Sequence, residues 1–258
     1  MEVSRLDPAL FLFFDDKSTR MSKERKLSGM ISTHVDDSLT VGKDSFRNQV
    51  EVPMIEKFKY RSDEELPFRY VGFNVERSKE GLTLDQNHYV SNLCETDVTL
   101  DAILLLDDLL DEEGQGNFRS IAAKLSMLSV TSRPDIAFDS KIMTTKFGKA
   151  VKRDLKQALK LLKRVKKEST KMIYPCLGKL IDWIIIGYAD ASVYSIPDRI
   201  GSVGGQVIIL ANRKLDRACV LGWRSKQLCR VVHSSLAAEA LAMLDLFGDI
   251  KYTKDMLQ

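Results

Sequence analysis

Two adjacent aspartates, Asp36 and Asp37, interrupt an apolar stretch of the sequence, STHVDDSLTVG (residues 32–42). Neighbouring carboxylates repel each other, and aspartate is unfavourable within a β-strand. Such a pair therefore marks either a solvated acidic turn or a point where dense negative charge is needed. Carboxylate oxygens are the ligands that Mg²⁺ prefers in proteins, so the second alternative predicts a magnesium site at these residues.

A second candidate site is a helix with a strongly basic face, predicted over residues 151–167. Apolar residues recur on one side of this segment with helical spacing, and nearly all of its other side is Lys or Arg. The basic residues are Lys152, Arg153, Lys156, Lys160, Lys163, Arg164 and Lys167. Such a face can contact the phosphates of a nucleic acid, which positions a duplex without reading its sequence. The alternative is an ordinary solvated helix surface.

The composition is that of an ordinary globular protein. The chain has 258 residues, 44% of them hydrophobic and 29% charged, and its formal net charge of +3 indicates no class of partner. The cysteines Cys94, Cys176, Cys219 and Cys229 are scattered without a C-x-x-C pair. This predicts reduced thiols in an intracellular protein, in the cytoplasm or the nucleus, without a zinc site or a disulfide framework. We expect no membrane partner, because no stretch reaches the roughly 20 apolar residues of a membrane helix.

The hydrophobic pattern predicts an α+β fold. In the first half of the chain it favours strands at 10–14 and 30–41, a helix at 51–62, a hairpin over 68–86 and a helix at 88–95. In the second half it favours helices at 118–132, 135–148 and 151–167, strands at 182–190, 203–210 and 219–224, and a helix at 235–247. The run WIII is apolar on both faces, so strand 182–190 is expected at the centre of its sheet.

Five motifs resemble, in this order, the reverse transcriptase and RNase H part of Ty1/copia-type retrotransposon polyproteins. HVDDSLTVG resembles the Y-V-D-D hairpin of the palm, and YVGFNVERSKEGLTLDQNHYVSNL resembles F-L-G-I…L-x-L-x-Q-x-x-Y-I. FRSIAAKLSMLSVTSRPDIAF resembles Y-R-S-x-x-G-x-L-x-Y-L-x-x-x-T-R-P-D-I. GYADAS is similar to the Y-S-D-A-D start of the RNase H domain, and LGWRSKQLCRVVHSSLAAEALAM to W-x-S-K-x-Q…S-S-x-x-A-E-x-x-A. Together these motifs cover most of residues 30–245.

The resemblance implies three segments: a partial palm at 1–115, a helical thumb or connection at 116–175, and a truncated RNase H-like sheet with one helix at 176–258. It implies a fragment of a Pol polyprotein whose ancestral activities are RNA-directed DNA synthesis and ribonuclease cleavage of RNA–DNA hybrids, each with two Mg²⁺ ions. The expected partners are an RNA–DNA hybrid or another duplex, and missing upstream and downstream segments of the polyprotein.

The resemblance also assigns roles to four acids. Asp36 and Asp37 match the metal-binding aspartates of the palm, Asp190 matches the first RNase H carboxylate, and Glu239 matches the second. Asp190 ends a predicted strand and Glu239 lies one turn into a predicted helix, so we expect their carboxylates within about 8 Å, where they could share an Mg²⁺ pair. His34 stands where the family usually has Tyr, and the family's other catalytic aspartates fall outside the chain. The chain is therefore expected to be inactive alone.

Two other interpretations remain open. One is a non-catalytic nucleic-acid-binding protein derived from this family, which would bind duplexes without requiring a metal ion. The other is an unrelated soluble α/β scaffold whose acids all serve as turns and caps. In that scaffold Asp190 and Glu239 would not cluster, so the geometry of these two residues discriminates between the interpretations.

Overall fold

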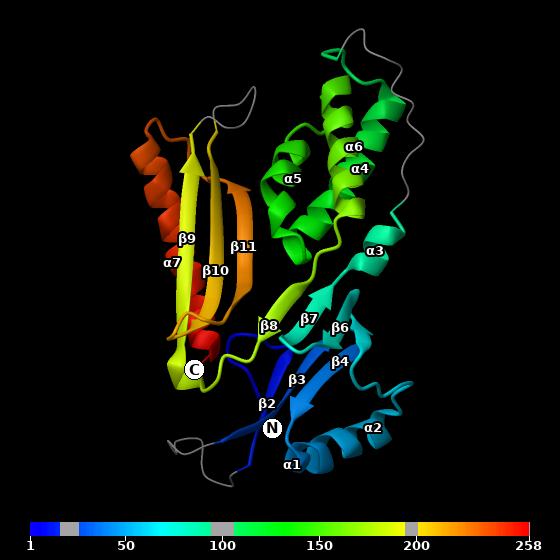
Figure 1. Ribbon diagram of the computed structural model, residues 1–258, viewed down its shortest axis with the longest axis vertical. Coiled ribbons are helices and arrows are strands. Elements are labelled where there is room, and N and C mark those ends of the chain that lie inside the picture. Colours follow the sequence, from blue (N-terminus) through cyan, green and yellow to red (C-terminus); the bar gives the residue numbers. More distant parts are fainter. Residues whose placement is uncertain (16–25, 94–105, 194–200, 258) are drawn as a thin grey trace. The chain divides into compact units, whose positions relative to one another are not determined.

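The computed structural model describes residues 1–15, 26–93, 106–193 and 201–257. Within these residues the fold is mixed α+β with three antiparallel sheets. Internal contacts divide the chain into two compact units, Met1–Val75 and Glu76–Gln258 (Figure 1). This division differs from the predicted segments 1–115, 116–175 and 176–258, because residues 76–93 pack with the helices and strands that follow them.

The first unit is built on a meander of four strands with the order β1-β2-β3-β4. The strands are β1 (Glu2–Val3), β2 (Leu10–Phe14), β3 (Leu27–His34) and β4 (Asp37–Gly42). Phe46 of the short helix α1 (Asp44–Phe46) fills the core beneath them and is 1% exposed. Its ring lies against Gly29 and Gly42, where any side chain would collide with it.

The predicted single strand at 30–41 is wrong, because these residues form the β3–β4 hairpin. His34 pairs with Asp37, and Val35 adopts a left-handed conformation with φ of 53° in the two-residue turn between them. The repulsion between neighbouring carboxylates is relieved in an exposed turn, since both aspartates can there face solvent. The motif VDD therefore supplies the two turn residues and the first residue of β4.

The helix predicted at 51–62 begins earlier and ends earlier. A continuous helical run consists of α1, the π-helix η1 (Arg47–Glu51) and α2 (Val52–Phe58), and it ends at Lys59 with φ of 53°. Beyond it, β5 (Phe68–Tyr70) and β6 (Phe73–Arg77) are joined by a tight turn with positive φ at Val71 and Gly72. The first arm of the predicted hairpin is thus two strands, whereas the turn predicted at SKEG is present, with Ser78 N donating to Gly81 O at 2.8 Å.

Three helices pack around the main core of the second unit. They are α4 (Glu112–Thr131), α5 (Ala137–Thr144) and α6 (Lys152–Lys167), with the 3-10 turn η2 (Pro134–Ile136) before α5. The sequence predicted all three, but α4 begins six residues earlier than expected. Asp111 explains this start, because its carboxylate accepts a hydrogen bond from Gly114 N at 2.8 Å and caps the helix. The core between the helices includes Phe118, Leu125, Leu128, Leu155 and Leu162.

A small strand pair lies next to these helices in the second unit. It consists of β7 (Gly81–Asp85) and β8 (Met172–Pro175), which pair antiparallel with Leu82 opposite Tyr174. Helix α3 (Asn87–Ser91) follows β7 directly. The helix predicted at 88–95 therefore ends at Ser91, and the last two residues of that prediction lie outside the described residues.

The remaining sheet is a meander of β9 (Trp183–Ser192), β10 (Val203–Asn212) and β11 (Ala218–Gln227), preceded by the 3-10 turn η3 (Leu180–Asp182). Its order is β11-β10-β9, so the predicted central position of strand 182–190 is wrong within the described residues. Consecutive hairpins place the middle strand of a meander at its centre. The burial agrees, because buried residues occur along the whole of β10 while none of β9 is fully buried.

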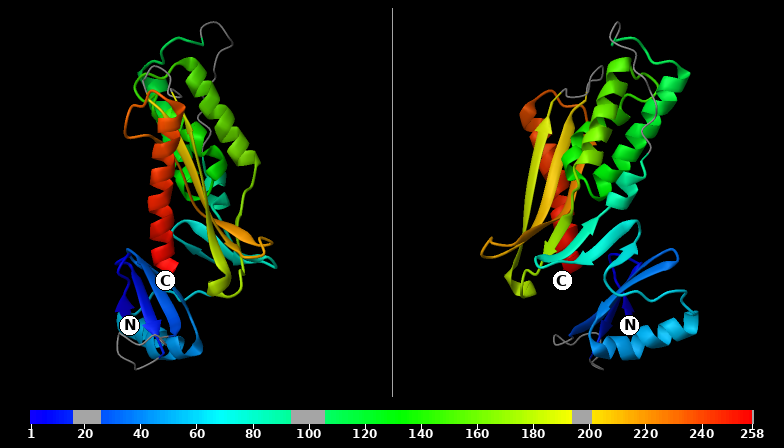
Figure 2. Two further views of the ribbon diagram at one scale, coloured as in Figure 1. Left: turned by 90° about the vertical axis from the view of Figure 1, so that its left-hand side faces the viewer. Right: turned by 45° about the vertical axis from the view of Figure 1, so that its right-hand side comes forward.

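Helix α7 (Ser235–Leu257) covers one face of this sheet (Figure 2). A side chain at Gly187 of β9 would meet Leu246 and Ile250 of α7, and a side chain at Gly204 of β10 would meet Ala242. Because side chains alternate across a strand, every second residue counted from Gly187 faces α7 and the residues between them face away. This reference fixes the direction of each side chain on β9.

Candidate nucleic-acid interface and predicted metal sites

Helix α6 is strongly amphipathic. Its buried side consists of Leu155, Ala158, Leu161, Leu162 and Val165. Asp154 accepts a hydrogen bond from Val151 N at 3.0 Å and fixes the beginning of the helix. All seven basic residues predicted to contact phosphates, from Lys152 to Lys167, are exposed, so the predicted basic face is present.

Three members of that face are already engaged by acids. Lys152 Nζ lies 3.1 Å from Asp108, and Arg153 lies 2.6 Å from Asp107. Arg164 lies 3.9 Å from each of two carboxylates, Asp135 and Asp139. These three cations are partly neutralised and held in place, so they are less available to a phosphate than the sequence alone indicated.

The other four cations form one continuous stripe. Among the described residues no ion pair involves Lys156, Lys160, Lys163 or Lys167. Their spacing of four, three and four residues puts them on one side of the helix. At a rise of 1.5 Å per residue the stripe is about 16 Å long. We call these four residues the α6 lysine stripe; it is the densest unpaired positive charge on this helix.

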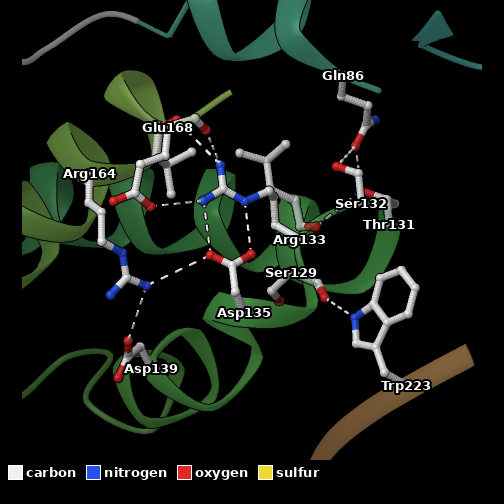
Figure 3. A network of polar contacts seen from close by, with 12 residues as sticks. Gln86, Ser129, Thr131, Ser132, Arg133, Asp135, Asp139, Arg164, Glu168 and Trp223 are labelled. Atoms are coloured by element: carbon white, nitrogen blue, oxygen red, sulfur yellow. Dashed lines mark hydrogen bonds and ion pairs between the residues drawn. The ribbon is translucent and has the colours of Figure 1, made fainter. Parts of the chain in front are cut away.

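Arg133, at the end of α4, is the centre of a polar network that holds the helices together (Figure 3). Its side chain is only 4% exposed and binds Asp135 through two hydrogen bonds, of 2.8 and 2.9 Å. Arg133 Nη1 also donates to the carbonyl oxygens of Val165 and Glu168, at 3.3 and 3.0 Å. These bonds from Arg133 lower the pKa of the Asp135 carboxyl below its ordinary value. Arg133 thereby ties η2 to the end of α6.

The same region joins three of the motif segments. Thr131 and Ser132 both donate to Oε1 of the buried Gln86, at 2.6 and 2.7 Å. Trp223 Nε1 of β11 donates to Ser129 O of α4 at 2.6 Å. These residues were not predicted as functional. The sequence signal for this region was the segment TSRPDI (residues 131–136). Its buried Arg133 and the paired Asp135 have a structural role here.

Asp36 and Asp37 lie at the tip of the β3–β4 hairpin, and both are exposed. They border a hollow of about 230 Å³ whose rim also carries acids, Glu51 and Asp63 among them, and basic residues such as Arg61. Glu51 is engaged, since it accepts a hydrogen bond from Thr40 at 2.5 Å. The two aspartates therefore lie in a hairpin, like the motif they resemble, but no further carboxylate of the described residues joins them in a metal-binding group.

Asp190 and Glu239 do not face each other. The β9–β10 register is continuous from Trp183 to Asn212, so Asp190, three residues beyond Gly187, points to the face opposite α7. Glu239 lies one turn before Ala242 on α7 and is therefore at the same end of the sheet but on its other side. The expectation of a shared Mg²⁺ pair is wrong at these residues, because strand alternation separates the two side chains.

The described residues do not fit a two-metal centre. Within them no group of three or more His, Cys, Asp or Glu side chains could hold a metal ion. Two-metal catalysis requires carboxylates that contact both ions. Within the described residues, neither pair of predicted acids is joined by a further metal-binding side chain. The fold of the described residues does not bring Asp36, Asp37, Asp190 and Glu239 together into a magnesium site.

Comparison with known proteins adds no relative. No protein family, curated protein or solved structure matches the chain. None of the helices in the described residues is long and apolar enough to cross a bilayer. The candidate site is therefore chosen from the structure of this chain alone, and the α6 lysine stripe is the best-formed candidate binding surface.

Proposed function

We propose that this chain is a nucleic-acid-binding protein of Ty1/copia-type reverse transcriptase and RNase H descent. It binds RNA–DNA hybrids and other duplexes through the α6 lysine stripe, without recognising their sequence. It carries out neither DNA synthesis nor hybrid cleavage by itself. The observation that carries the proposal is the stripe of Lys156, Lys160, Lys163 and Lys167, which has no acid partner among the described residues.

The chemistry of the stripe supports a phosphate ligand. Phosphate contacts supply most of the affinity of sequence-independent binding, and they come from Lys and Arg on one face of an element. Four ammonium groups along about 16 Å of helix can follow the phosphates of one strand. The apolar side of α6 is fully packed in the core, so the helix presents this charge from a rigid support.

The contacts among the motif segments support the descent. Three of the five segments that resemble the family are joined by hydrogen bonds. Thr131 and Ser132 of one segment donate to Gln86 of another. Trp223 of a third segment donates to Ser129, which belongs to the same segment as Thr131. A resemblance that arose by chance would not be expected to select residues that contact one another. Asp190 and Glu239 lie on opposite sides of the sheet, which is also what the unrelated scaffold predicts. Their arrangement therefore supports the absence of catalysis, and the descent is supported by the contacts among the motif segments.

The test is equilibrium binding of a fluorescently labelled RNA–DNA hybrid, measured by anisotropy at low salt. Reversing the stripe with Lys156→Glu, Lys160→Glu, Lys163→Glu and Lys167→Glu should abolish binding. Binding by the wild-type chain should persist in EDTA, because no metal ion takes part. Primer extension and hybrid cleavage in Mg²⁺ should both be undetectable.

A matched control separates the stripe from net charge. Lys79, Lys179, Lys214 and Lys251 are exposed residues of the second unit outside α6, and reversing them changes the net charge by the same amount. This control should keep its affinity within about threefold, allowing for the weaker long-range attraction. Equal loss in the two variants would overturn the assignment of the stripe, and primer extension abolished by Asp36→Asn would overturn the non-catalytic role.

A further inference from the structure

A groove of about 520 Å³ lies between α5 and the open face of the β9–β11 sheet. Pro134, Ala137 and Phe138 form the wall on the side of the helices, and β10 forms the floor. The far wall is β9. The face concerned is the one that α7 does not cover. Helix α5 contacts it at β11, where Trp223 also donates to Ser129 of α4. This volume is typical of a site for a small molecule.

The floor of the groove is open at Gly205, where a side chain would meet nothing within 4 Å. The strand register places Asp190 on one side of this glycine and Ser225 on the other. All three residues belong to one row across the sheet, on the face away from α7. The groove thus has a vacant centre between a carboxylate and a hydroxyl.

Within the part of the chain that the structure describes, Asp190 and Ser225 Oγ have no hydrogen-bond partner. Asp190 is exposed, and within the described residues it has neither a hydrogen bond nor an ion pair. Ser225 Oγ is buried and likewise has no hydrogen-bond partner among them. An exposed carboxylate that accepts no hydrogen bond from the described residues can accept bonds from a ligand.

Aromatic side chains surround the same space. Tyr188 of β9 is 62% exposed and Phe138 of α5 is 50% exposed. Both line the groove, together with Trp223. Tyr188 and Trp223 belong to the row next to Asp190, since both pair with Val207 of β10. Aromatic faces attract cations through their negative π surface, and a desolvated cation gains more than an exposed one.

We propose that this groove binds a small organic cation, an alkylammonium or a guanidinium group. The carboxylate of Asp190 supplies the opposite charge, the three aromatic rings supply cation–π contacts, and Gly205 leaves the room. An anionic ligand is excluded by the unpaired carboxylate, and a bare metal ion by the lack of further carboxylates. The proposal is independent of the α6 lysine stripe, which lies on a different element.

The test uses the fluorescence of Trp223 in a Trp183→Phe background, because the chain has two tryptophans. Choline and methylguanidinium serve as probes, and the neutral carbon isostere of choline serves as the control ligand. We expect saturable quenching by at least one cation and about tenfold weaker binding of the isostere, the size of a partly desolvated cation–π and charge contribution.

Two kinds of variant sharpen the result. Asp190→Asn keeps the shape and should weaken cation binding about tenfold, and Phe138→Ala should weaken it severalfold. Asp182→Asn, an exposed acid on η3, should change nothing. Absence of saturation for both cations, equal binding of choline and its isostere, or unchanged affinity in Asp190→Asn with native circular dichroism would each overturn the proposal.

Discussion

At the scale of single residues, the chain uses similar charged groups in opposite ways. Arg133 is buried, and its guanidinium donates hydrogen bonds to one carboxylate and two carbonyl groups. Lys160 and Lys163, on the neighbouring helix, are exposed and have no ion partner within the described residues. The first arrangement stabilises a fold, and the second is available to a ligand. Burial and partners, rather than residue type, separate the two roles.

Removal of the Arg133 side chain should be strongly destabilising. Arg133→Ala leaves two carbonyl oxygens of α6 and its cap without donors, and leaves Asp135 without its main partner. We expect the free energy of unfolding to fall by about 3 kcal/mol, the usual cost of breaking a buried, hydrogen-bonded pair. Chemical denaturation measures it. Arg119→Ala, an exposed arginine on α4, should stay within about 0.5 kcal/mol, and an equally small loss in Arg133→Ala would refute the structural role.

The Asp135 pair predicts a pH dependence. Hydrogen bonds from Arg133 lower the pKa of the Asp135 carboxyl in the folded chain. A depressed carboxyl pKa stabilises the fold at pH values above the pKa of the unfolded chain, and this stabilisation is lost as the pH falls through the folded pKa. The difference in unfolding free energy between the wild type and Asp135→Asn should therefore be constant near neutral pH and shrink below about pH 4. A difference that grows on acidification would contradict the pairing.

Cysteine reactivity tests the packing of the β9–β11 sheet. Cys219 is 8% exposed beneath α7, and burial raises the pKa of its thiol. Cys176 and Cys229 are exposed. In a Cys94→Ser background, a thiol reagent at mildly alkaline pH should modify two cysteines quickly and Cys219 slowly, because the thiolate is the reactive form. Mass spectrometry identifies the sites, and fast modification of Cys219 in the folded chain would show that α7 does not cover it.

At the scale of elements, the first unit depends on one close contact between a helix and a hairpin. Phe46 lies so near Gly29 that an added methyl group would be 2.1 Å from the ring. Gly29→Ala should therefore overpack this core and reduce the unfolding free energy by about 1–3 kcal/mol. Thermal denaturation checks this. Gly222→Ala, where a side chain would meet nothing within 4 Å, is the control, and equal stability of the two variants would contradict the contact.

The elements themselves were largely predictable, whereas their partners were not. Helix α6 was predicted to within a residue, because its apolar spacing is strictly helical over four turns. The edge position of β9 was missed, since a run such as WIII indicates burial on both faces but not the strand order that produces it. The direction of Asp190 was missed for a related reason. A sequence gives the alternation of side chains along a strand, but only the contact of Gly187 with α7 shows which face is which.

At the scale of the whole molecule, neither predicted catalytic site is assembled within the described residues, although Asp36 and Asp37 do lie in a hairpin. The VDD hairpin belongs to the first unit, and the Asp190 strand and the basic helix belong to the second. The motif segments fold in both units, but no group of three or more metal-binding side chains forms among the described residues, as a two-metal reaction would need. The basic helix needs no such companions, because phosphate binding depends only on the sum of its charges. This is why we propose nucleic-acid binding rather than catalysis.

The central claim is tested most directly by the salt dependence of duplex binding. If the α6 lysine stripe neutralises four phosphates of a B-form DNA duplex, the logarithm of the affinity should fall against the logarithm of the salt concentration with a slope of roughly −3.6. The double variant Lys156→Gln, Lys167→Gln should lose about two of these contacts, and its slope should be roughly −1.8. A slope that is the same in the wild type and in this double variant would contradict the account, because the stripe would then not contact the phosphates.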